Sequence, residues 1–155
     1  MATVDEFKLF LEKVSMEAGL DTLAPSEDGL LQLQAGDIEL NLQFIPSANK
    51  IFVCTEIGFL PETAPSALYR LLLSEQVMGY HTGGGSFALV KGNDVLVYQI
   101  VCDFCPAEPA AFAQLLSDVL DFTEKWRGKL SDLLNGQGDV ESPAVTPEMQ
   151  FPFFV

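Results

Sequence analysis

Basic residues are scarce in this chain of 155 residues, which has 8 Lys and Arg against 22 Asp and Glu and a formal net charge of -14. Binding to nucleic acid or to anionic lipid begins by neutralising phosphate, so the excess of negative charge argues against both partners. The same charge favours partners with basic segments, and it serves solubility alone equally well. Charge therefore excludes more function classes than it identifies.

Long apolar runs are also missing. No stretch approaches the ~18 uncharged apolar residues that a membrane-spanning helix needs. Residues 1–8 carry acidic side chains where a secretory signal would carry basic ones. We therefore expect a cytoplasmic protein without membrane insertion, and the length and the 48% hydrophobic content suffice for one domain with a sizeable core.

Histidine and cysteine are too few for the familiar catalytic sets. His81 is the only histidine, and the glycine run at residues 83–85 lacks the Lys-Ser/Thr pair of a phosphate-binding loop. Cys102 and Cys105 have the spacing of a redox motif or half a zinc site, but a four-ligand zinc site would also need Cys54 and His81. We expect ordinary thiols, no enzyme activity, no cofactor and no metal. A metal or small-ligand site built from scattered carboxylates stays open as an alternative.

The spacing of apolar residues predicts an α+β protein with the order α-β-β-β-α-β-β-α. Thr3 and Glu6 form a capping box at the start of the first helix. Alternating runs on either side of Gly36 and Asp37 indicate a hairpin. The expected helices are 4–18, 66–78 and 109–135, and the expected strands are 31–35, 38–44, 51–57, 87–90 and 95–102.

Two of these segments carry more apolar residues than one small core requires. The strand at 51–57 is apolar on both faces for most of its length, so it is either covered on both sides or has one side that awaits a ligand. The helix at 66–78 covers more than one apolar stripe, which favours two neighbours, the sheet and a second subunit.

Residues 85–98 combine a glycine, a short strand, a turn of small residues and a long apolar strand. This pattern, the order of the elements, the acidity and the helix at 109–130 resemble the class I type III secretion chaperones, the Tir-chaperone family, over about residues 3–134. The resemblance implies a twisted antiparallel sheet packed by helices. It also implies a homodimer that binds the N-terminal segment of a secreted effector polypeptide in an extended, secretion-competent form. The runner-up is a regulatory or interaction domain with the same fold, which binds a folded partner.

The resemblance also implies which residues carry the function. By position, a peptide-binding groove on the first helix and the neighbouring sheet would use Phe7, Phe10, Leu33, Phe44, Phe52 and Cys54. A dimer interface on the second helix would use Leu68, Leu71, Leu72, Val77 and Met78. The Cys102 and Cys105 pair has no place in this family pattern.

Residues 1–135 form the expected domain, and residues 136–155 form a tail that contains Gly, Ser and Pro and ends in an aromatic segment. The tail extends past the usual end of the family. It is either a disordered terminus or a groove-occluding segment in which Phe151, Phe153 and Phe154 mimic the client.

Overall fold

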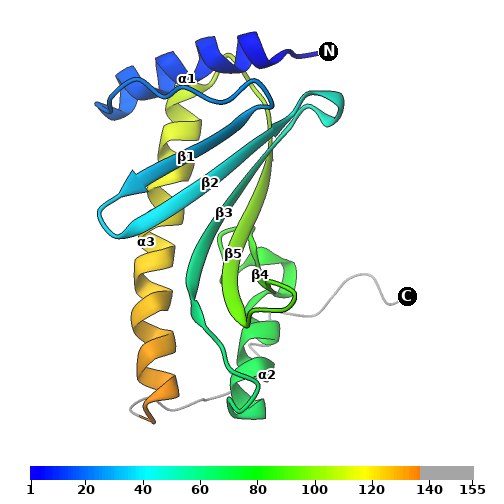
Figure 1. Cartoon of the computed structure of the whole chain (residues 1–155), viewed down its shortest axis with the longest axis vertical. Helices are drawn as coiled ribbons and strands as arrows, with labels where there is room; N and C mark the ends of the chain where they lie inside the picture. Colours follow the sequence, from blue (N-terminus) through cyan, green and yellow to red (C-terminus); the bar gives the residue numbers. More distant parts are fainter. Residues whose placement is uncertain (137–155) are drawn as a thin grey trace.

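The computed structural model describes residues 1–136, and Figure 1 shows how their helices and strands are arranged. The predicted α+β order is confirmed within this part of the chain. The elements are α1 (Val4–Ala18), β1 (Leu30–Ala35), β2 (Ile38–Ile45), the short helix η1 (Pro46–Ala48), β3 (Lys50–Phe59), α2 (Ser66–Glu75), the short helix η2 (Val77–Gly79), β4 (Ser86–Leu89), β5 (Val95–Asp103) and α3 (Pro109–Leu134).

Local sequence signals explain the first elements. The Thr3 hydroxyl accepts a hydrogen bond from the Glu6 amide at 3.2 Å, and the Glu6 carboxylate accepts one from the Thr3 amide at 2.8 Å. This is the predicted capping box, and Gly19 ends α1 with a φ of 65°. Gly36, with a φ of 62°, makes the tight turn between β1 and β2.

The five strands form one antiparallel sheet in the order β1-β2-β3-β5-β4, so β1 and β4 are its edges. In Figure 1 the twisted strands pass in front of α3, which runs along the length of the sheet, and α1 lies across its upper end. The inner face of the sheet is the one that contacts α3. On this face Gly58 lies so close to α3 that a Cβ there would be 3.1 Å from Leu130.

Aromatic side chains fill the core between the helices and the inner face. Phe7 of α1 stacks on Phe44 of β2 with ring centroids 4.8 Å apart, and Phe10 lies 5.4 Å from Phe112 at the start of α3. At the other end of α3, Trp126 packs 4.7 Å from Phe87 of β4. The helix α3 therefore runs along the whole of one continuous core, and α1 packs at the end where α3 begins.

The second helix is shorter than the sequence predicts. It ends at Glu75 rather than at residue 78, and Met78 of η2 adopts a φ of 53°, which an α-helix excludes. The loop between η2 and β4 is held in place by hydrogen bonds within the loop and to β5. The Thr82 hydroxyl donates to the Gly85 carbonyl at 2.6 Å, and the Tyr98 hydroxyl donates to the Thr82 carbonyl at 2.6 Å.

Candidate peptide-binding surface

Three of the six residues predicted to line a groove are core residues. Phe7 and Phe44 are 0% exposed and Phe10 is 2% exposed. Because their rings pack against one another and against Phe104, they are not available to a ligand on the surface of this chain. In the single chain these three aromatic residues of α1 and β2 therefore stabilise the core.

The other three predicted groove residues do not lie on one surface. Leu33 of β1 is partly buried and faces inward, in register with buried Leu40 of β2. Phe52 and Cys54 of β3 face the opposite side of the sheet, where Phe52 is 43% exposed. The structure therefore brings only Phe52 and Cys54 together on an accessible face.

This outer face carries an apolar strip along β3 and β5. The burial of β3 alternates from residue to residue, so one of its faces is covered and the other is open. On the open face Phe52 pairs with Val101, which is 46% exposed, and Phe59 pairs with Val95. We call this surface the outer apolar strip, and its residues are Phe52, Cys54, Phe59, Val95, Val97 and Val101.

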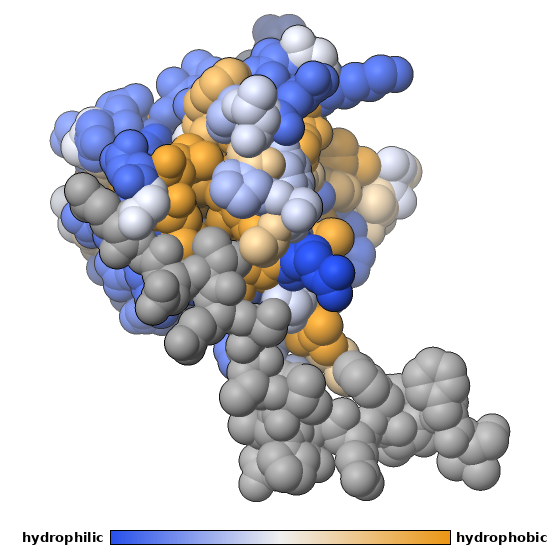
Figure 2. All heavy atoms as spheres, turned by 90° about the horizontal axis from the view of Figure 1, so that it is seen from below, coloured by the Kyte–Doolittle hydropathy of each residue, from blue (hydrophilic) through white to orange (hydrophobic). Residues whose placement is uncertain are grey.

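Polar side chains border and interrupt the strip. Glu56 pairs with Val97 and Gln99 pairs with Cys54 across the two strands, and both polar residues are exposed. At one end of the strip Phe59 is 57% exposed. Figure 2 views the lower end of the molecule of Figure 1, and apolar surface lies there among polar atoms. Such rimmed apolar surfaces are typical of places where a partner binds.

The edge strand β1 offers main-chain hydrogen bonds beside this face. The Leu30 amide bonds to the Ser26 hydroxyl and not to β2. Because the hydrogen bonds of a strand alternate in direction, the main-chain groups of Gln32 and Gln34 also point away from β2. A surface groove of about 570 Å³ runs along this edge and is lined by Ala24, Pro25, Ser26, Leu30, Leu31, Gln32 and Asn41. An extended peptide has both an edge and a groove to bind.

The residues predicted to form a dimer interface are divided between core and surface. Leu68, Leu71 and Leu72 are 0%, 4% and 4% exposed and pack into the core of their own chain. Val77 is partly buried, and Met78 is 59% exposed. The apolar surplus of α2 that the sequence shows is thus used mainly within one chain. The exposed apolar residues of α2 and the segment that follows it are Leu73, Met78 and Tyr80.

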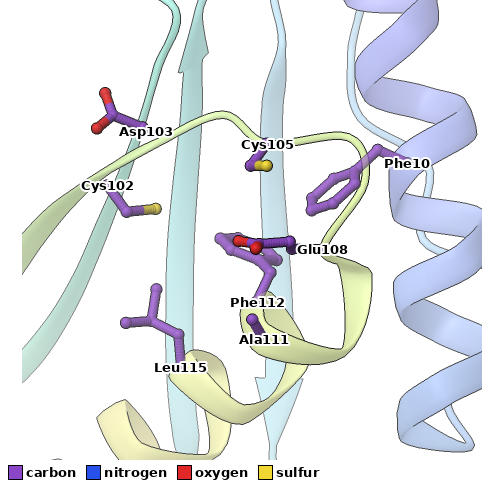
Figure 3. A pocket seen from close by; sticks show the side chains of 8 residues that line it. All are labelled: Phe10, Cys102, Asp103, Cys105, Glu108, Ala111, Phe112 and Leu115. Atoms are coloured by element: carbon purple, nitrogen blue, oxygen red, sulfur yellow. The ribbon is translucent and has the colours of Figure 1, made fainter.

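The two cysteines with redox-like spacing lie on the wall of a different cavity. Figure 3 shows a pocket at the C-terminal end of β5. Its volume is about 160 Å³, and it is lined by Phe10, Cys102, Asp103, Cys105, Glu108, Ala111, Phe112 and Leu115. Burial, followed by the nearby Asp103 carboxylate, raises the pKa of the Cys102 thiol, so this thiol is a weaker nucleophile at neutral pH. Within residues 1–136, no three His, Cys, Asp or Glu side chains are placed to hold a metal ion.

No helix among residues 1–136 is long and apolar enough to span a membrane. Among residues 1–136, helices cover the inner face of the open sheet, and Phe52, Phe59 and Val101 are exposed on its outer face. This arrangement is that of a binding protein of the secretion-chaperone type.

The sequence profile of the Tir chaperone protein (CesT) family matches residues 10–127, which is about three quarters of the chain. The chain belongs to this family. The resemblance read from residues 85–98 is therefore confirmed, as is the expectation of a chaperone rather than an enzyme. A comparison with curated proteins finds no match.

Solved structures with the same fold include several from type III secretion. A chain of the ExsC-ExsE complex aligns with a TM-score of 0.69 at 16% identity, over 83% of this chain and 96% of that one. A chain of the HopA1-SchA chaperone-effector complex aligns with a TM-score of 0.65 at 11% identity, over 81% and 95%. The structure of the Yersinia pestis type III secretion chaperone SycH with a fragment of YscM2 gives 0.63 at 20% identity, over 77% and 98%. These likenesses confirm the fold.

Proposed function

We propose that this protein is a cytoplasmic chaperone that binds the N-terminal segment of a type III secretion effector and holds it in an extended, secretion-competent form. The observation that carries the proposal is the outer apolar strip, on which Phe52, Phe59 and Val101 are 43%, 57% and 46% exposed while Val97 between them is buried. Membership of the Tir chaperone family and the likeness to a chaperone-effector complex support it.

The geometry suits an unfolded client better than a folded one. A strand edge supplies hydrogen bonds to any main chain, and neighbouring apolar pockets accept alternate side chains. The edge of β1 and the outer apolar strip provide these two elements on one sheet, with the largely polar outer face of β2 between them. The net charge of -14 keeps the chaperone soluble while the strip is exposed, and it attracts basic segments of the client. Binding of this kind needs no cofactor.

Capture of a client by purified variants tests the proposal. The chain is co-expressed with the N-terminal segments of secreted effectors from the same genome, and the bound segment is examined by limited proteolysis. We expect a client that remains protease-sensitive when bound and that is lost with Phe52→Asp, because a charge on the strip is costly to bury. Leu134→Asp, which places the same charge at the end of α3, serves as the matched control and keeps the client. A protease-resistant, folded partner would favour the regulatory domain instead.

The dimer is a second part of the proposal. We infer that the surface around α2 and η2 pairs with a second copy of the chain through Leu73, Met78 and Tyr80, which are 68%, 59% and 70% exposed. The left-handed backbone of Met78 supports this inference. A non-glycine residue with positive φ costs of order 1–3 kcal/mol, so the fold retains it at a site where its side chain is needed.

Light scattering tests the dimer. The protein is expected to be a dimer, and Leu73→Asp is expected to yield a folded monomer because a lone charge destabilises an apolar interface. Leu73 is exposed in the single chain, so this change spares the core, unlike a change at buried Leu72. Leu134→Asp should remain dimeric. A wild-type protein that is monomeric at working concentration contradicts the inference.

A further inference from the structure

The aromatic segment at residues 149–155 has no part in the function proposed for the folded domain. It contains Phe151, Phe153 and Phe154, and it follows a stretch that contains Gly138, Pro143 and Pro147. The segment lies outside the described residues. The prediction that it covers a groove therefore depends on the apolar surface that the described residues expose. Burial of each Phe side chain is favourable by about 1.5–3 kcal/mol. The segment therefore gains free energy from an apolar surface within its reach.

The outer apolar strip begins close to the point where this segment leaves the domain. Leu130, in the last turns of α3, packs against Gly58 on the inner face of the sheet. The next residue, Phe59, lies on the outer face at the start of the strip, so the segment has to pass around the sheet to reach it. At about 3.3 Å per extended residue, the stretch from residue 136 to residue 151 spans up to about 50 Å. The strip from Phe59 to Phe52 is about 23 Å long at the rise of a strand. The aromatic segment reaches its whole length.

We propose that residues 149–155 bind the outer apolar strip of their own chain and occupy the place of the client until a client displaces them. This proposal rests on the proposed function, since it assigns an occupant to the same surface. The tether gives the segment an effective concentration of the order of millimolar, so a weak affinity is sufficient for occupancy. A client that also pairs with the edge of β1 makes contacts that the tail lacks.

The chemistry of the segment fits the face of a sheet rather than its edge. Pro152 has no amide hydrogen and interrupts any ladder that the segment would form with an edge strand. On the face of a sheet the contacts are made by side chains, so the missing donor has no effect there. Phe151, Phe153 and Phe154 are apolar, as are Phe52 and Val101, which are 43% and 46% exposed on that face.

The rate of Cys54 alkylation measures whether residues 149–155 cover the outer apolar strip, and the measurement needs no client. Cys54 lies on the strip, diagonal to Val101, and Cys105 is exposed in the loop before α3. The full chain and the variant F151S/F153S/F154S are treated with N-ethylmaleimide, and the rate at each cysteine is followed by peptide mass spectrometry. We expect Cys54 to react several-fold faster in the variant and Cys105 to react at the same rate in both. The variant V140S/V145S, which makes the linker more polar and leaves the aromatic residues in place, should behave as the wild type.

A second substitution tests whether the protection of Cys54 by the tail depends on the outer apolar strip. Phe52→Ser removes the exposed ring beside Cys54, so it should raise the Cys54 rate in the chain with the natural tail. The tail variant should then raise that rate little further. Equal Cys54 rates in the wild type and in F151S/F153S/F154S overturn the proposal. Because no client is present, that outcome leaves the client-capture experiment as the separate test of chaperone function.

Discussion

The buried hydroxyl of Thr55 allows a direct test of how the inner face of the sheet is packed. Thr55 lies on β3, is 1% exposed, and its hydroxyl is the buried side-chain polar atom without a hydrogen-bond partner among residues 1–136. A buried polar group without a partner costs about 1–3 kcal/mol. Thr55→Val keeps the shape and removes the hydroxyl, so it is expected to stabilise the protein by about 1 kcal/mol or more. For a domain of this size that corresponds to a rise in melting temperature of roughly 2–4 °C.

The matched control is Thr123→Val in α3. Thr123 is 0% exposed, and its hydroxyl donates a hydrogen bond to the Val119 carbonyl at 2.7 Å. Its loss should destabilise the protein by about 0.5–1.5 kcal/mol. Urea unfolding measures both changes, and an unchanged slope against denaturant shows that the two transitions are comparable. If Thr55→Val destabilises the protein as much as the control does, the Thr55 hydroxyl has a partner and the reasoning is refuted.

Two further predictions concern the loop that closes against β5. Gly85→Ala is expected to destabilise the protein by several kcal/mol, because the new Cβ would lie 2.4 Å from the Tyr98 ring. The control is Gly128→Ala at an open helical position, which should stabilise the protein by about 0.5–1 kcal/mol. Thermal denaturation measures both changes. Burial raises the pKa of the Tyr98 hydroxyl above its ordinary value of 10.0, so the folded state holds this proton more tightly than the unfolded state. The free energy of unfolding should therefore fall as the pH rises above about 10, and Tyr98→Phe should reduce that fall in urea titrations while losing the hydrogen bond to Thr82.

The elements with strong local signals were predicted almost to the residue. The helix expected at 4–18 is α1, and the turn expected at Gly36 and Asp37 joins β1 to β2. In both cases the signal is local, since a capping box and a two-residue turn act over a few neighbouring residues. The end of α2 was missed because Met78, an ordinary helix former, adopts a positive φ that its own sequence does not require.

The site was harder to predict than the fold, because apolar content does not specify which neighbour covers a side chain. Phe44 and Phe52 are both aromatic residues of adjacent strands, yet one is 0% and the other 43% exposed. Their difference depends on tertiary packing, because Phe7 of α1 and Phe104 pack against Phe44 on the inner face, whereas Phe52 lies on the outer face. One signal was available: alternation through the strand at 51–57 places Phe52 and Cys54 on the face opposite Ile51. The sequence did not show that Val101 of β5 lies beside Phe52 on that face, because this depends on the register between β3 and β5.

We expect Glu56 to favour a client over the tail at the outer apolar strip. Glu56 is exposed on the outer face between Cys54 and Phe59, and residues 137–155 contain no Lys or Arg to pair with it. A client with a basic residue at that register gains an ion pair of about 0.2–1 kcal/mol that the tail lacks. Glu56→Gln is therefore expected to weaken client binding up to about fivefold at low salt and to leave the tail-dependent protection of Cys54 unchanged. The difference in affinity should shrink at high salt, where exposed charges are screened. If Glu56→Gln lowers client affinity equally at both salt concentrations, the residue acts through packing and not through its charge.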